Sequence, residues 1–74
     1  MKFTYQEFSK LLTESKYQFN LKTKDSIYFI TPKDYDAFNE HGFVAHNEVN
    51  GNIDILHYKE IVQIIIDSKK INYE

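Results

Sequence analysis

The sequence predicts one α+β domain, spanning residues 1–74, in which an N-terminal helix packs on a small, curved antiparallel sheet of four or five strands. A short second helix is expected between strands. Two observations predict this class: apolar residues recur at helical spacing near the N-terminus, and short alternating or apolar stretches separated by turn residues follow. Seventy-four residues without cysteine allow one core and no disulfide.

The N-terminal helix is predicted by a capping box and a hydrophobic staple. Thr4 and Glu7 have the spacing at which the hydroxyl accepts from a first-turn N–H and the carboxylate reaches back to the threonine N–H. Phe3 and Phe8 stand at the two staple positions. The apolar face, which should lie on the sheet, consists of Tyr5, Phe8, Leu11, Leu12 and Ser15.

A β-hairpin is expected next. Residues 17–22 alternate apolar and polar side chains, which is the period of a half-buried strand, and residues 27–30 form a more continuously apolar strand. Residues 23–26 supply turn chemistry between them. The apolar face of this hairpin needs the N-terminal helix as its cover.

The second helix is predicted from Pro32 to His41. Thr31 suits the N-cap, proline suits the first helical position, and Asp34 places a carboxylate in the first turn. His41 and Gly42 suit the C-terminal end, because a cation is favoured there and glycine readily adopts the left-handed cap conformation.

An Asn-Gly pair predicts a second hairpin between residues 43–49 and 53–58. A two-residue turn would mix apolar and polar side chains on both faces. A shift by one residue pairs Val49 with Ile53, so we expect a three-residue loop or a bulge. That register collects on one face Phe43, Ala45, Val49, Ile53 and Ile55.

The C-terminal block, residues 58–66, allows two interpretations. Tyr58, Ile61, Val62 and Ile65 match helical spacing, whereas the many β-branched residues favour a strand. The strand interpretation is preferred, with a short helical turn at residues 58–60 and a further turn from residue 67.

The order of these elements, a helix before a curved antiparallel meander with a tight turn between long strands, resembles small barrels of the SH3-like or Sm-like kind. The segment 53–66 carries what sequence likeness there is. The resemblance implies a barrel and no particular function, and the inserted second helix departs from it.

Composition limits the possible functions. The nine basic residues are all lysine, and six tyrosines and six phenylalanines accompany them. Arginine is the usual residue for bidentate capture of phosphate, so its absence and a net charge of −2 disfavour nucleic acid. Abundant Lys, Ile, Asn and Tyr are also typical of an AT-rich genome. No apolar run is long enough to cross a membrane.

Catalytic and metal motifs are missing from the sequence. No serine nucleophile elbow or phosphate-binding glycine loop is present, so neither an enzyme nor a cofactor is expected. The candidate metal ligands lack the usual spacings, so no metal is expected either. These candidates are His41, His46, His57, Glu48 and Asp54, and in the expected hairpin register Glu48 faces Asp54.

The predicted binding site is an acidic and aromatic group on the second helix, formed by Asp34, Tyr35, Asp36 and Glu40. Tyrosine is enriched at interfaces and acidic groups steer association, so this group would suit a protein partner with a basic patch. The alternative is a solvated helix face.

These observations predict a small non-enzymatic binding protein of the cytoplasm that acts through protein–protein contact. A phage or mobile-element accessory protein that inhibits or modulates a host macromolecule would fit. The alternative is a small-barrel module for single-stranded nucleic acid, with aromatic rings stacking on bases and lysines meeting phosphates. Self-association through isoleucine-rich edge strands stays open.

Overall fold

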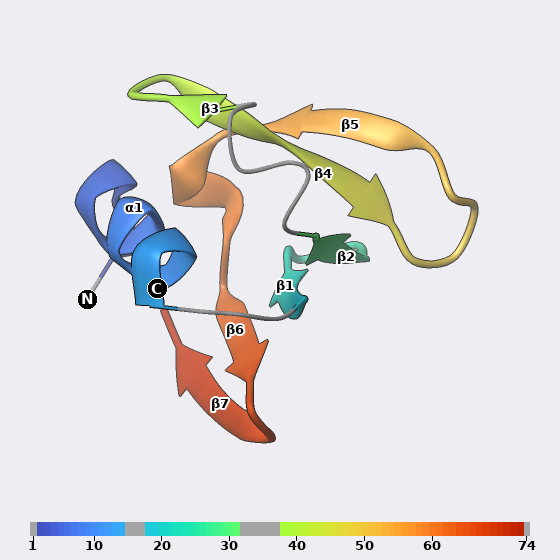
Figure 1. Cartoon of the computed structure of the whole chain (residues 1–74). Helices are drawn as coiled ribbons and strands as arrows, with labels where there is room; N and C mark the ends of the chain where they lie inside the picture. Colours follow the sequence, from blue (N-terminus) through green and yellow to red (C-terminus); the bar gives the residue numbers. More distant parts are fainter. Residues whose placement is uncertain (1, 15–17, 32–37, 74) are drawn as a thin grey trace.

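The computed structural model describes residues 2–14, 18–31 and 38–73, and it has the predicted α+β architecture (Figure 1). One helix precedes an antiparallel sheet of seven strands, where four or five were expected. The elements are α1 (Tyr5–Glu14), β1 (Phe19–Lys22), β2 (Ile27–Ile30), β3 (Phe38–Asn39), β4 (Gly42–Asn47), β5 (Ile53–Leu56), the 3-10 helix η2 (Tyr58–Glu60), β6 (Gln63–Ile66) and β7 (Lys69–Asn72).

The sheet is open. Its strands follow the order β3-β4-β2-β1-β6-β7, and β5 pairs with β4 outside this path. Phe43 of β4 pairs with both Phe38 and Leu56, so β3 and β5 flank opposite sides of β4. Because the described strands do not close on themselves, the SH3-like or Sm-like barrel is not observed.

The helix α1 begins with the predicted threonine cap and hydrophobic staple. The Thr4 Oγ1 accepts from the Glu7 N–H at 3.2 Å, and the Phe3 and Phe8 rings meet edge to face with centroids 6.0 Å apart. The Glu7 carboxylate accepts a hydrogen bond from the Tyr73 hydroxyl, which links α1 to the end of the chain. The capping threonine and the staple therefore form the predicted helix start.

An aromatic cluster joins α1 to the sheet. The buried Phe8 ring lies 4.4 Å from the Phe43 ring in a stacked arrangement. Its centroid also lies within 6.3 Å of the rings of Phe3, Phe19, Phe38 and Tyr58. Rings from the helix, β1, β3, β4 and η2 thus meet in one core.

The β1–β2 hairpin is confirmed. Phe19 pairs with Ile30 and Lys22 with Ile27, and the Thr23 N–H donates to the Ser26 carbonyl at 3.0 Å to close the turn.

The prediction that the second helix continues to His41 is wrong. Phe38 and Asn39 form β3, and the Asn39 Oδ1 accepts from the backbone N–H groups of His41 and Gly42 in a tight turn to β4. Gly42 is not a helix cap; a Cβ there would lie 2.5 Å from the Leu56 carbonyl oxygen, so glycine permits close approach of β5. The remainder of that prediction, residues 32–37, lies outside the described residues.

The predicted register of the β4–β5 hairpin is also wrong. Phe43 pairs with Leu56 and His46 with Ile53, and the Asn47 N–H donates to the Asn52 carbonyl at 2.8 Å. The turn therefore has four residues, 48–51, where a three-residue loop or a bulge was expected.

Asn47 explains this longer turn. Its Oδ1 accepts from the N–H groups of Val49 at 2.9 Å and Asn50 at 3.3 Å, and its carbonyl accepts from Gly51. Asparagine side chains commonly bond their own following backbone in this way. Gly51, at φ +74°, supplies the left-handed conformation that the turn requires.

The strand interpretation of the C-terminal block is confirmed. The turn of 3-10 helix at Tyr58–Glu60 joins β5 to β6, and β6 pairs with both β1 and β7. Asp67 and Ser68 have positive φ angles of 50° and 65° and form the tight turn between β6 and β7.

Candidate functional site: an exposed aliphatic hairpin face

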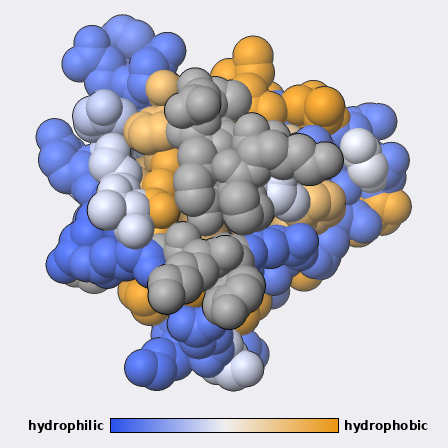
Figure 2. Space-filling model, in the orientation of Figure 1, coloured by the Kyte–Doolittle hydropathy of each residue, from blue (hydrophilic) through white to orange (hydrophobic). Residues whose placement is uncertain are grey.

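The β4–β5 hairpin carries an unusual concentration of exposed aliphatic side chains. Val49 is 87% exposed, Ile55 82% and Ile53 63%. Of the four large apolar side chains that are exposed in the described part of the chain, these are three, and the fourth is Tyr5 on α1. Hydrophobic atoms accordingly reach the surface over β5 (Figure 2).

The strand register places Ile53 and Ile55 on one face of the hairpin. Successive residues of a strand point to opposite faces, so Ile55 and its partner Val44 share a face with Ile53 and its partner His46. The opposite face carries the buried Phe43, Ala45 and Leu56. We call the first group the outer hairpin face, defined by Val44, Ile53 and Ile55, with Val49 at the adjoining turn.

The neighbouring strand β2 extends this face. Phe29 pairs with His46, and the two rings stack with centroids 5.1 Å apart and planes at 15°. The His46 imidazole therefore packs on the Phe29 ring, next to Ile53.

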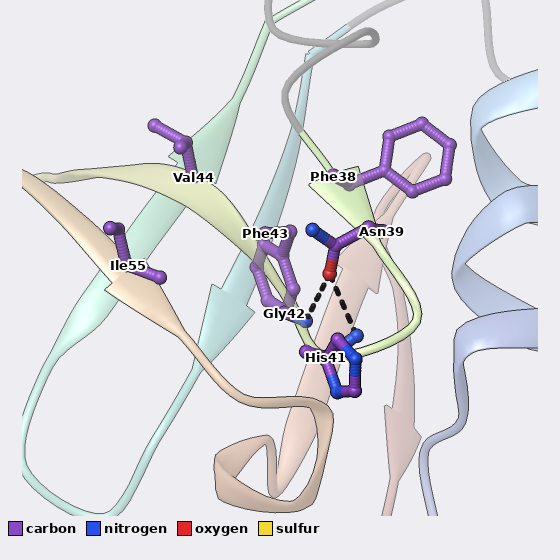
Figure 3. Close-up of a pocket in the computed structure, with 7 residues that line it drawn as sticks. All are labelled: Phe38, Asn39, His41, Gly42, Phe43, Val44 and Ile55. Atoms are coloured by element: carbon purple, nitrogen blue, oxygen red, sulfur yellow. Dashed lines mark hydrogen bonds between the residues drawn. The ribbon is translucent and has the colours of Figure 1, made fainter.

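A shallow hollow of about 420 Å³ adjoins the outer hairpin face (Figure 3). Figure 3 shows Val44 and Ile55 side by side at one end, whereas the Phe38 ring points toward the helix. The hollow is lined by Phe38, Asn39, His41, Gly42, Phe43, Val44 and Ile55. Its aliphatic end and the polar Asn39–His41 turn together form a surface suited to contact with another molecule.

The predicted acidic site is only partly located. Asp34, Tyr35 and Asp36 lie outside the described residues. Glu40 lies in the exposed β3–β4 turn, where its carboxylate is 3.6 Å from the His41 imidazole, and not on a helix. The acidic contact patch therefore stays a prediction.

The candidate metal ligands lie in different settings. Asp54 pairs with Ala45, so it does not face Glu48, and the Glu48 carboxylate accepts from the Asn20 amide at 2.7 Å. The His57 Nδ1 accepts from the Lys59 N–H and caps η2. Within residues 2–14, 18–31 and 38–73, no three His, Asp or Glu side chains gather where a metal could bind.

Two tyrosines have strongly perturbed pKa values, and both serve the core. Burial, with a smaller repulsion from Tyr5, raises the pKa of Tyr58 to about 12. The Tyr58 hydroxyl donates to the Asn39 carbonyl at 2.5 Å and also contacts the Gly42 carbonyl at 3.3 Å. This tyrosine therefore holds the β3–β4 turn against η2, and its perturbation has a structural cause.

Sequence reasoning missed the outer hairpin face because the expected register placed Ile53 and Ile55 with Phe43 and Ala45. Leu56 could have indicated the correct faces of this strand. If the leucine points inward, Ile53 and Ile55 must point outward, because successive strand residues alternate between the two faces.

Comparisons of the chain with protein families, with curated proteins and with solved structures gave no match. In the part of the chain that the structure describes, no helix has the length and apolar character needed to cross a membrane. The assignment of function therefore depends on the surface itself.

Proposed function

We propose that this chain is a non-enzymatic protein-binding module that contacts its partner through the outer hairpin face. The observation that carries the proposal is the exposure of Ile53 and Ile55 next to Val44 on one side of a paired hairpin.

The energetics support a contact role. Burying a large aliphatic side chain is worth about 1.5–3 kcal/mol, and Ile53 and Ile55 leave most of this gain unused in the free chain. Exposed apolar side chains that stand singly need no explanation, whereas a contiguous patch is typical of an interaction site. Ile53 and Ile55, next to Val44 on one face of the hairpin, make such a patch.

The chemistry of the patch favours a protein over nucleic acid. Single-stranded nucleic acid is bound by exposed aromatic rings and a basic groove. Here the aromatic rings of Phe8, Phe19 and Phe43 are buried, the half-buried Phe29 ring is already stacked on His46, and neither β4 nor β5 contains a lysine. Aliphatic side chains around a strand suit the apolar centre of a protein interface.

The biological setting comes from composition. A cytoplasmic location, a host macromolecule as target and a phage or mobile-element origin stay predictions based on the lysine-rich, arginine-free sequence.

The test replaces the patch without disturbing the core. A double variant, Ile53→Lys with Ile55→Lys, should retain the fold because both side chains are exposed, and it should reduce capture of host proteins from a lysate at least tenfold by quantitative mass spectrometry. Thr13→Lys, at an exposed position of α1, is the matched control for an added lysine.

Two results would contradict the proposal. One is capture of the same proteins by the folded double variant at the wild-type level. The other is salt-sensitive binding of labelled single-stranded RNA or DNA that competes with the captured proteins, which would support the nucleic-acid module instead.

A further inference from the structure

We propose that the free edge of β5 binds an extended segment of the partner protein as an added strand, and that this segment has a basic residue between two apolar residues. This inference rests on the proposed function and specifies the partner's chemistry.

The first argument is the open edge itself. The strand β5 pairs with β4 on one side, and the described part of the chain places no strand on the other. In an antiparallel pair, ladder bonds join alternate residue pairs. Because Asn47 bonds Asn52 at the hairpin end, the next bonded pair is Ala45 with Asp54. The N–H and C=O groups of Ile53 and Ile55 therefore point toward the open side.

The second argument is that the other edge strands have features that disfavour pairing with an additional strand. Edge strands are commonly protected by lysines or by extreme shortness. The strand β7 has the exposed Lys69 and Lys70, and β3 is only two residues long. The strand β5 has four residues, no lysine and no proline, and its outer face carries two isoleucines. It is the edge best suited to accept another strand.

Asp54 selects the occupant of this edge. It is the one charged residue of β5 and lies between the two outward isoleucines, on the opposite face. If a second copy paired Ile53 with Ile55 across a twofold axis, Asp54 would stand opposite its own copy, and like charges directly opposite each other are destabilising. A lysine or arginine opposite Asp54 would be favourable instead.

Ile53 and Ile55 determine which partner residues suit the two positions beside the basic residue. Directly opposite residues in paired strands lie on the same face, so the partner residues opposite Ile53 and Ile55 would lie on the same face as these isoleucines, with β5 between them and Val44. Apolar side chains there would extend the patch, and the segment therefore reads apolar, basic, apolar. Backbone hydrogen bonds to the added strand would provide affinity, and the side chains would provide specificity.

The first part of the test uses synthetic capped peptides with the folded, full-length chain. A peptide Ser-Thr-Val-Lys-Val-Thr-Ser is compared with one that has Glu in place of Lys, by titration of the isotope-labelled protein observed by NMR. We expect the Lys peptide to shift the amide signals of Ile53 and Ile55 and to bind at least fivefold more tightly than the Glu peptide. Asp54→Lys should reverse this preference.

The second part isolates the backbone bonds. Ile55→Ala and Ile55→Pro both remove the isoleucine side chain, but only proline also removes the outward N–H, which an edge strand tolerates. We expect Ile55→Pro to bind the Lys peptide at least fivefold more weakly than Ile55→Ala, with both variants retaining a dispersed NMR spectrum.

Several outcomes would overturn strand addition. Equal binding of the two peptides, equal binding by the two Ile55 variants, or a wild-type dimer in sedimentation that Asp54→Asn strengthens would each do so, the last in favour of a second copy. If protein capture still depends on Ile53 and Ile55 but not on these backbone and charge changes, the proposed function stands and this inference fails.

Discussion

At the scale of single residues, Asn47 has the largest consequence for the surface. It is a polar residue with only 6% of its surface exposed, and its side-chain oxygen holds the turn after β4. The turn length sets the pairing of β5, and the pairing determines that Ile53 and Ile55 face outward. The Asn47 turn is thereby compatible with the one register that buries Phe43, Ala45 and Leu56 in the core and leaves the aliphatic patch outside.

Tyr73 provides a test at the same scale. Burial, followed by the hydrogen bond to Glu7 and its negative charge, raises the pKa of Tyr73 to about 12 from 10. Below pH 10 the hydroxyl is protonated in both states, so its contribution to stability is complete. Between pH 10 and 12 the unfolded chain loses the proton first, and the free energy of unfolding falls.

Tyr73→Phe should therefore flatten the decline of the unfolding free energy across this alkaline range. Urea denaturation followed by circular dichroism at several pH values measures the slope. The slope should not vanish, because Tyr58 has a similarly raised pKa. A variant slope equal to that of the wild type would contradict this assignment.

At the scale of elements, local signals predicted most of the helix and strand positions. The capping threonine and staple placed α1, alternation placed β1, and β-branched residues placed β6. The length of the β4–β5 turn and the strand β3 could not be predicted from local signals. The Asn-Gly signal is compatible with several turn lengths, and the residues near Phe38 carry helix-start signals upstream although Phe38 itself pairs with Phe43 in the sheet.

Gly42 tests how closely β4 and β5 approach. A Cβ at this position would lie 2.5 Å from a backbone oxygen of Leu56, and backbone cannot move aside cheaply. We expect Gly42→Ala to destabilise the protein by up to about 3 kcal/mol in chemical denaturation and to speed amide exchange in β4.

The control is Gly51→Ala, where nothing lies within 4 Å of the added carbon and only the positive φ opposes it. It should destabilise by roughly 1 kcal/mol and leave exchange in β4 unchanged. If both variants behave alike, close approach at Gly42 is not the constraint.

At the scale of the whole molecule, rings that are distant in sequence form one core. The Phe8 ring contacts rings as far apart in the sequence as those of Phe3 and Tyr58, and only 1% of the Phe8 surface is exposed. A chain of 74 residues should have a total stability of about 4–11 kcal/mol.

Phe8→Ala should therefore cost about 3–5 kcal/mol, a large share of the total stability, as measured by thermal and urea denaturation. Val49→Ala, at an 87% exposed position, should change stability by less than about 0.5 kcal/mol. A loss below about 1 kcal/mol for Phe8→Ala would show that the ring cluster is not the centre of the core.

The candidate site was not predictable in the same way. Of the acidic group proposed from the sequence, Glu40 is described, and it lies in a turn. The outer hairpin face emerges only when the register of β5 is known, because a shift by one residue exchanges the faces of a strand.

The sequence by itself determined the α+β class, the helix with its cap and staple, the first hairpin and the 3-10 turn before β6, because each depends on hydrogen bonds and periodicity over a few residues. The tertiary structure alone decided the β2–β4 and β1–β6 pairings, the open sheet and the outward direction of Ile53 and Ile55. These depend on which distant segments share one core, and burial there is a property of the assembled chain.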